Sequence, residues 1–180
     1  MRLLLFLTLT ACARPAAHVH PSMTDAPADP SAYGSEVVEG VRRARAATAA
    51  FKNLDSAVAN GYAAKVAACI SDSSQGTMGF HHLNRSHVDE KVEVEKPEFL
   101  LYERKPDGSY VLNAVEYIIP YRAWPKDSVP PRLLGRQMLK SDVLQYWYLH
   151  MWIWTPNQSG LFADWNRDVR CFLGRFSLKG

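Results

Sequence analysis

The segment from Pro97 to Tyr121 constrains the fold more than any other part of the chain. Two runs rich in β-branched and aromatic residues, PEFLLYE and YVLNAVEYIIPY, are joined by RKPDGS. A Pro-Asp-Gly turn between two such runs is typical of a β-hairpin. We therefore expect an antiparallel sheet built around this hairpin.

The residues before the hairpin predict helix, and those after it predict one more strand. Ser35 can cap a helix, and the NGY sequence at Asn60 can stop one, so we expect one or two helices between about residues 35 and 68. LQYWYLHMWIWTP is typical of a long aromatic strand. The sequence predicts a single α+β domain over 35–180, with the helical region packed on a small antiparallel sheet. The expected apolar stripe of the helical region is Val37, Val41, Ala44, Thr48, Phe51 and Val58.

The N-terminus resembles the signal of bacterial lipoproteins. MRLLLFLTLTAC places one Arg before an apolar run and ends in LTAC, which matches all four positions of a lipobox. The resemblance implies a signal peptide over 1–11, a Cys12 carrying palmitate-like acyl chains, and a Pro/Ala-rich tether over 12–34. Arg14, where inner-membrane lipoproteins carry Asp, implies the outer membrane, with the domain facing the periplasm. The expected partner is thus the membrane, through lipid.

Charge and cysteine usage fit an exported domain. The whole chain has a net charge of +3, which falls by one with Arg2, and we see no basic stripe with interleaved aromatics. The sequence therefore favours no nucleic-acid partner. Apart from Cys12, the remaining cysteines are Cys69 and Cys171, and in an oxidising compartment we expect them to form a disulfide. Such a loop of about 100 residues is worth at most ~4.7 kcal/mol in the chain-entropy model.

Glu116 is the most informative charged residue, because it interrupts an apolar run in a predicted strand. A buried carboxylate there needs a cation, a proton or a hydrogen-bond partner. If the hairpin loop has five residues, Lys105 to Ser109, then Arg104 lies opposite Tyr110 and Glu98 lies opposite Glu116. A four-residue loop would shift every pair by one. The five-residue register puts the following residues on one face with the two glutamates: Leu100, Tyr102, Leu112 and Ala114.

The histidines are spread over two predicted strands and a loop. His150 lies in YLHMWIW with bulky apolar neighbours, so we expect it to be buried, either as a core residue or as a ligand. In MGFHHLN, His81 and His82 point to opposite sides of an extended segment, so both could serve one site only across a bulge. His87 follows in a polar stretch, where a solvated loop residue is the expected reading.

Together these side chains predict a transition-metal site. His81 or His82, His150 and Glu116 would meet on one small sheet, with Glu98 and Glu103 as weaker candidates. Histidine and carboxylate suit Zn, Fe, Mn or Cu, and Met78 could join a soft copper site; the list of metals stays open. The same groups could instead serve general acid/base chemistry. No serine stands in a G-x-S-x-G context, so covalent hydrolysis is disfavoured.

The alternative is a ligand-binding or envelope-interaction protein without chemistry. Strand alternation groups His150 with Trp152 and Trp154, and such aromatic side chains could line a pocket for a small molecule. They could equally fill the core. The segment after them is turn-rich, and its side chains predicted to cap turns are Asn157, Asp164 and Asn166.

Four segments carry a wider resemblance: MGFHHLN, PEFLLYE, AVEYIIP and HMWIWTPNQSGLFADWN. Over roughly residues 45 to 171 the chain looks like a group of uncharacterised exported bacterial proteins and lipoproteins. The resemblance implies a secreted domain, and it implies no substrate or activity.

Overall fold

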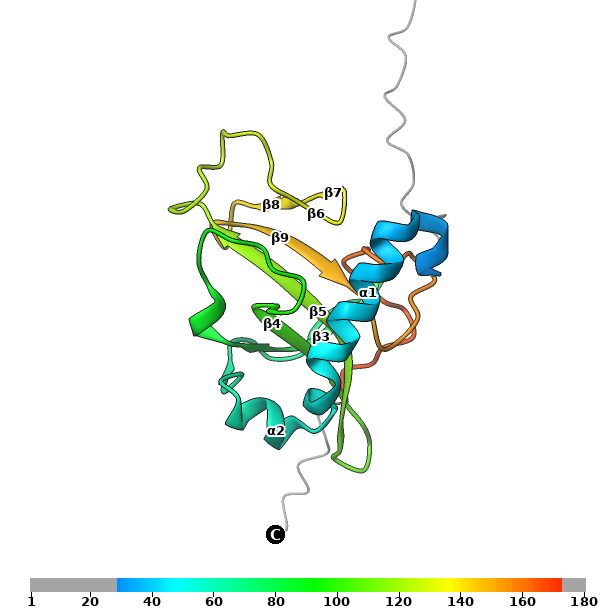
Figure 1. Cartoon of the computed structure of the whole chain (residues 1–180). Helices are drawn as coiled ribbons and strands as arrows, with labels where there is room; N and C mark the ends of the chain where they lie inside the picture. Colours follow the sequence, from blue (N-terminus) through cyan, green and yellow to red (C-terminus); the bar gives the residue numbers. More distant parts are fainter. Residues whose placement is uncertain (1–28, 173–180) are drawn as a thin grey trace, which may run out of the picture.

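The structure is a computed structural model that describes residues 29–172, and it confirms the α+β class (Figure 1). The predicted signal peptide, Cys12 and most of the tether fall in residues 1–28, outside the described part. Helix α1 crosses one face of a central antiparallel sheet (Figure 1). The helical elements are η2 (Pro30–Tyr33), α1 (Ser35–Thr48), η3 (Ala49–Lys52), α2 (Leu54–Ala59) and η4 (Arg85–His87).

The central sheet has seven strands, in the order β1-β3-β4-β5-β9-β8, with β2 also paired to β3. All of these pairs are antiparallel, and a separate two-stranded ribbon joins β6 to β7. The strands are β1 (Ala64–Lys65), β2 (Ile70–Asp72), β3 (Gly76–Leu83), β4 (Phe99–Arg104), β5 (Tyr110–Pro120), β6 (Arg132–Leu133), β7 (Arg136–Gln137), β8 (Leu139–Ser141) and β9 (Tyr146–Met151).

The helical region is shorter than the sequence predicted. It ends at Ala59, where Gly61 takes a positive φ of 98°, as expected for the NGY stop. The buried face of α1 is Val37, Gly40, Val41, Ala44 and Thr48, which confirms the first half of the apolar stripe. The second half was wrong at Val58, which is 42% exposed on the short helix α2. The expected cap was also wrong, because Gly34 occupies the N-cap position and Ser35 is already helical.

The hairpin turn has the predicted five residues, but the register changes beyond it. Arg104 lies opposite Tyr110, as expected, and then Asn113 is an extra residue on β5 with no partner on β4. Its carbonyl instead accepts hydrogen bonds from the backbone N–H groups that follow β9. This bulge shifts all later pairs by one, so Phe99, not Glu98, lies opposite Glu116. The predicted pairing of the two glutamates was therefore wrong.

The bulge also changes the face of the sheet to which the even-numbered residues of β5 point. Before it, Leu112 packs toward α1 with Leu100 and Tyr102; after it, Ala114 and Glu116 point to the opposite face. The buried apolar residues toward α1 include Val37, Val41, Ala44, Leu100, Tyr102, Leu112, Val115, Tyr117, Ile119, Trp147, Leu149 and Met151. The cluster on the other face is Leu83, Phe99, Leu101, Ala114, Ile118, Trp152 and Val169.

The predicted disulfide is present. Cys69 and Cys171 are bonded across 102 residues of sequence. Cys69 directly precedes β2, so the bridge ties the end of the described chain to the segment that runs from β1 into β2. Among the helices of residues 29–172, none has the length and apolar character that crossing a bilayer would require.

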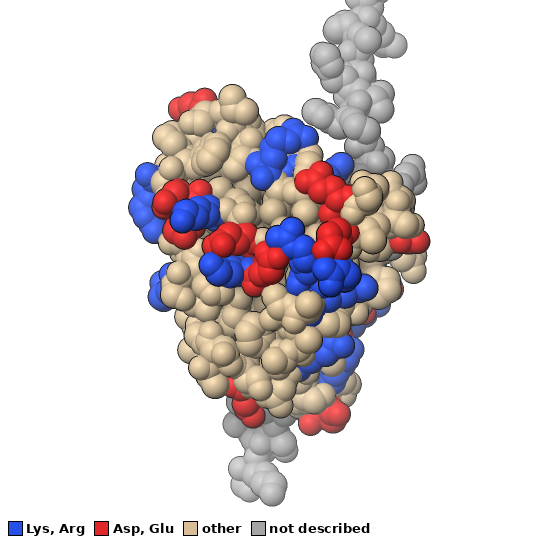
Figure 2. Space-filling view, viewed as in Figure 1, with Lys and Arg blue, Asp and Glu red and all other residues tan. Residues whose placement is uncertain are grey.

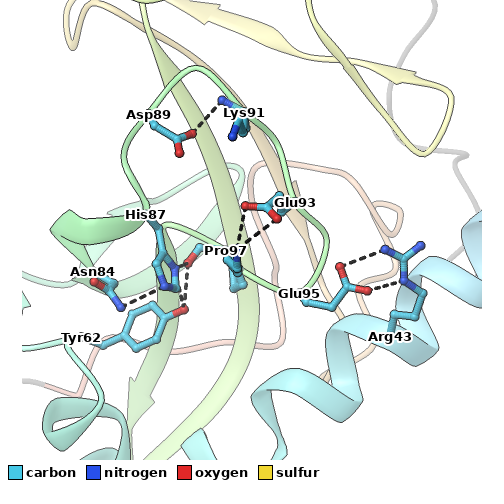
Figure 3. Close-up of polar contacts among 10 residues, drawn as sticks. Arg43, Tyr62, Asn84, His87, Asp89, Lys91, Glu93, Glu95 and Pro97 are labelled. Carbon is cyan, nitrogen blue, oxygen red and sulfur yellow. Dashed lines mark hydrogen bonds and ion pairs between the residues drawn. The ribbon is translucent and has the colours of Figure 1, made fainter.

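The loop from η4 to β4 is held in place by polar contacts (Figure 3). His87 Nδ1 lies 2.9 Å from the carbonyl oxygen of Pro97, and Tyr62 donates to the same oxygen at 2.8 Å. Arg43 of α1 forms an ion pair with Glu95 of the loop. The reading of His87 as a solvated loop residue was wrong, because it is half-buried within this network.

The face that carries α1 presents Lys and Arg side chains intermingled with Asp and Glu (Figure 2). Three exposed ion pairs contribute to it, and such pairs are typically worth no more than about 1 kcal/mol each. The pairs are Arg42–Glu39, Arg43–Glu95 and Lys96–Glu93.

Candidate metal centre

Three of the predicted ligands meet on the face of the sheet opposite α1. His81 is on β3, Glu116 is on β5, and His150 is the cross-strand partner of Glu116 on β9. Glu116 Oε2 lies 3.5 Å from His81 Nε2 and 3.8 Å from His150 Nε2. One donor atom from each residue falls within 4.8 Å of the other two, so this buried His–Glu–His group could hold a metal ion.

Two of the converging atoms are buried without conventional partners. Glu116 Oε2 and His150 Nε2 have no hydrogen bond within residues 29–172, and on His81 the nitrogen that also lacks one is Nδ1, not the Nε2 that lies near Glu116. All three side chains are at most 6% exposed. Leaving a buried polar group unsatisfied costs about 1–3 kcal/mol, and more for a charged one. A bridging cation would satisfy several of these atoms at once.

Burial sets the protonation of the group. Burial raises the pKa of Glu116 to about 7, although His150 opposes the shift. Burial lowers the pKa of His81 to about 3, with a further contribution from His150, so this imidazole is neutral at physiological pH. Burial also disfavours the imidazolium of His150, but the carboxylates of Glu116 and Asp164 outweigh it and raise the pKa of His150. A neutral imidazole is the form of histidine that binds metals.

Asp164 orients the His150 ring from the side away from Glu116. Its Oδ1 lies 3.2 Å from His150 Nδ1, and its Oδ2 accepts a 2.9 Å hydrogen bond from the hydroxyl of Tyr148. A proton on Nδ1 directed at Asp164 leaves the Nε2 lone pair facing Glu116. Metal-binding histidines are commonly held in this way by a carboxylate on their other nitrogen.

Gly79 allows β3 to bring His81 to the site. Its φ is +102°, and a Cβ there would lie 2.6 Å from the carbonyl oxygen of Tyr102 on the neighbouring strand. Only glycine tolerates both the backbone conformation and this close approach. The tight β3–β4 contact therefore fixes the strand two residues before His81.

The three polar side chains form one wall of a cavity of about 390 Å³. Most of the remaining wall is apolar, and it includes the segment between β1 and β2 that the disulfide holds. Met78, which we considered as a soft ligand, also lines this cavity. The cavity has the size and the mixture of apolar wall and few polar groups that are typical of small-molecule sites. Its apolar wall is formed by Val66, Ala67, Ile70, Met78, Phe99 and Leu144.

Three other candidate ligands lie elsewhere. His82 points to the α1 side, where its ring packs against Tyr102. Glu98 accepts a 3.0 Å hydrogen bond from the backbone N–H of Ile118. Glu103 forms a 2.6 Å ion pair with Lys105. Each of these side chains thus has another structural role, and alternation along β3 explains why only one of the adjacent histidines reaches the site.

Trp152 and Trp154 do not share a pocket. Strand β9 ends at Met151 and the backbone then turns, so the expected alternation holds at Trp152 and Ile153 but fails at Trp154. Trp152 is buried in the apolar cluster on the site face and donates to the carbonyl of Ala163. Trp154 packs on the α1 side and donates to Thr48. Neither lines the cavity beside the three ligands.

Sequence reasoning missed two contributors to the site. Asp164 was expected to cap a turn, but its carboxylate serves Tyr148 and His150 instead, whereas Asn157 and Asn166 do cap turns as predicted. Tyr148 carried a usable signal, since it lies two residues before His150 on a strand and so shares its face. Asp164 lies 14 residues beyond His150 in irregular structure, where no periodicity places it.

Comparison with protein families, curated proteins and solved structures finds nothing that matches this chain. The site geometry and the sequence therefore carry the functional argument.

Proposed function

We propose that this protein binds a transition metal ion through His81, Glu116 and His150. The observation that carries the proposal is the convergence of three buried donor groups, in which Glu116 Oε2 and His150 Nε2 have no hydrogen-bond partner in residues 29–172. Two imidazoles in the neutral form and one carboxylate make a donor set used by Zn²⁺ and by non-haem Fe²⁺, so binding would displace the proton that the raised pKa of His150 favours. The candidate metals are Zn, Fe, Mn and Cu.

The distances support this assignment. Two ligand atoms about 2.1 Å from a tetrahedral metal lie roughly 3.4 Å apart. The separations of 3.5 and 3.8 Å from Glu116 to the two histidines are close to this value. The cavity lies on the free side of the group, so a bound metal would keep room for a water molecule or a ligand. Sites with an open coordination position are those that support chemistry.

The competing reading is a purely structural cluster, in which His150 is an imidazolium between Glu116 and Asp164. Elemental analysis by mass spectrometry distinguishes the two. The chain is produced in a bacterial periplasm, kept oxidised, and purified without a histidine tag. We expect close to one equivalent of Zn, Fe, Mn or Cu, and loss of that metal in Glu116→Gln and in His150→Ala. Glu103→Gln is the matched control. Glu103 is also buried, but it pairs with Lys105 and lies outside the His81–Glu116–His150 group, so this variant should retain the metal.

A protein that is purified without metal and takes up none of the four added ions would overturn the proposal. In that case the cluster is a buried imidazolium–carboxylate pair. Normal folding of the variants is checked by circular dichroism, so that loss of metal cannot be mistaken for loss of structure.

We further propose that the domain is anchored in the bacterial envelope through an acylated Cys12. The support is the lipobox LTAC in the sequence, and the Cys69–Cys171 disulfide fits an oxidising compartment. Labelling with radioactive palmitate should mark the chain and fail in Cys12→Ser. A chain that carries no label, or is released as a soluble protein from spheroplasts, contradicts this part.

A further inference from the structure

A second hollow lies next to the cavity beside the three candidate ligands. This outer groove has a volume of about 460 Å³, and it runs past the ends of β3 and β5. Phe99, Leu144 and Tyr146 line both the cavity and the groove. Because the two spaces share three wall residues, one elongated ligand could occupy both.

The outer end of this joint space has cationic side chains and no carboxylate. Arg85 and Arg122 line it, whereas the inner end contains Glu116 together with Lys140, whose ammonium group lies 5.1 Å from the centre of the Trp147 ring. Neither guanidinium group has an ion pair or hydrogen bond within residues 29–172, and no Asp or Glu of those residues lines the groove. Two unpaired guanidinium groups beside an apolar groove favour an anion, since arginine binds carboxylate and phosphate groups in a bidentate manner.

The rim where the two spaces meet is apolar and exposed. Leu144, in the turn between β8 and β9, is 59% exposed, and its neighbour Val143 is 92% exposed. Large apolar side chains at the mouth of a cavity mark a surface that gains from contact with an apolar partner. The apolar body of a ligand would cover Leu144 on its way from the groove into the cavity.

From these observations we infer that the joint space binds an elongated amphipathic anion, a single-chain carboxylate of medium length. Its carboxylate lies at Arg85 and Arg122, its chain passes between Phe99, Leu144 and Tyr146, and its far end enters the cavity beside His81, Glu116 and His150. The inference rests on the proposed metal site only for the role of that far end, which would face the metal. Binding of the chain itself needs the groove and the two arginines.

Isothermal titration calorimetry with dodecanoate, below its micelle concentration, tests this inference on metal-free and metal-loaded protein. We expect one saturable site, and affinity that falls by up to about fourfold for each methylene removed from the chain. Dodecyltrimethylammonium, which has the same chain and the opposite charge, should bind at least tenfold more weakly. Acetate should show no binding, because it lacks the apolar body.

The double variant Arg85→Gln/Arg122→Gln should weaken dodecanoate binding about tenfold and leave the metal content unchanged. Lys91→Gln/Lys126→Gln is the matched control, because it removes the same charge from side chains that line neither space. Equal binding of the cationic and anionic chains, or wild-type affinity in the arginine variant, overturns the inference. Wild-type protein stripped of metal by a chelator separates the two proposals, since it lacks the metal and should keep dodecanoate.

Discussion

Glu116 and His150 face each other across β5 and β9, with 3.8 Å between the carboxylate Oε2 and the imidazole Nε2, and Oε2 accepts no hydrogen bond from any group in residues 29–172. The two side chains lie in the middle of the sheet, where an apolar pair would pack without this cost. A folded protein that keeps such an arrangement sacrifices stability for it, which is characteristic of functional sites.

Glu116→Gln should therefore stabilise the metal-free protein. The amide keeps the shape of the side chain, removes a buried charge, and can donate to the free nitrogen of a neighbouring histidine. We expect a gain of about 1–3 kcal/mol in the free energy of unfolding at pH 8, measured by urea denaturation in the presence of a chelator. With saturating metal the order should reverse. A variant that is less stable than wild type without metal would show that Glu116 is already satisfied in the metal-free fold.

Asp164→Asn should weaken metal binding without removing a ligand. The amide no longer favours a proton on His150 Nδ1, so the Nε2 lone pair is less well directed at the metal. Loss of such an outer partner typically costs 10–100-fold in affinity. Competition with a chromophoric chelator gives the affinity. Tyr148→Phe is the graded control, because it removes only the hydrogen bond to Asp164 and should cost less. Wild-type affinity in Asp164→Asn would mean that packing alone orients the ring.

Glu98 should make the stability of the protein depend on pH. Burial raises the pKa of Glu98 to about 8. Between about pH 5 and 8 the unfolded chain has lost this proton while the folded protein retains it, so the contribution of Glu98 to stability falls as pH rises. Glu98→Gln keeps an acceptor for the N–H of Ile118 and removes the titration.

The measurement is the difference in unfolding free energy between wild type and Glu98→Gln, without metal. It should shift in favour of the variant by roughly 1.4 kcal/mol per pH unit across this window. Taking the difference removes the contributions of Glu116 and of the buried histidines, which titrate in both proteins. Parallel pH curves would place the pKa of Glu98 in the folded protein near its ordinary value.

Gly79→Ala should damage both the fold and the site. The positive φ alone costs about 1–3 kcal/mol for an alanine, and the new Cβ would press on the carbonyl oxygen of Tyr102. Gly108→Ala is the matched control: it has a φ of +90°, but its Cβ would meet only an arginine side chain, at 3.6 Å. We expect thermal unfolding to show a larger loss for Gly79→Ala, and only this variant should weaken metal binding. Equal losses would indicate that the β3–β4 contact yields easily.

Much of this fold was predictable because local signals agreed with it. The Pro-Asp-Gly turn and its flanking apolar runs gave β4, the five-residue loop and β5 correctly. The assignment of His150 to a buried strand position, and the disulfide, also followed from the sequence. His81 could not be chosen over His82 from the sequence, because alternation says only that the two differ in face.

The features that the sequence did not predict depend on irregular backbone. The bulge at Asn113 is stabilised by hydrogen bonds that its carbonyl accepts from the backbone N–H groups of Trp154 and Thr155, some 40 residues away in sequence. No local sequence pattern therefore predicts it. The same holds for the turn after Met151, which separates Trp152 from Trp154, and for the chain that returns Asp164 to His150. Each is a long-range contact that overrides a regular period.

The bulge has an evolutionary consequence. If the same residues paired without a bulge, the register of the turn would continue along β5, and Glu116 would pass from the cavity to the side covered by α1. Loss of Asn113 itself would instead make the ladder regular and leave Glu116 opposite Phe99. A lineage that keeps the candidate site is therefore expected to have either this bulge or a hairpin arm that is one residue shorter, whereas one further residue between the turn and this glutamate would need a second bulge.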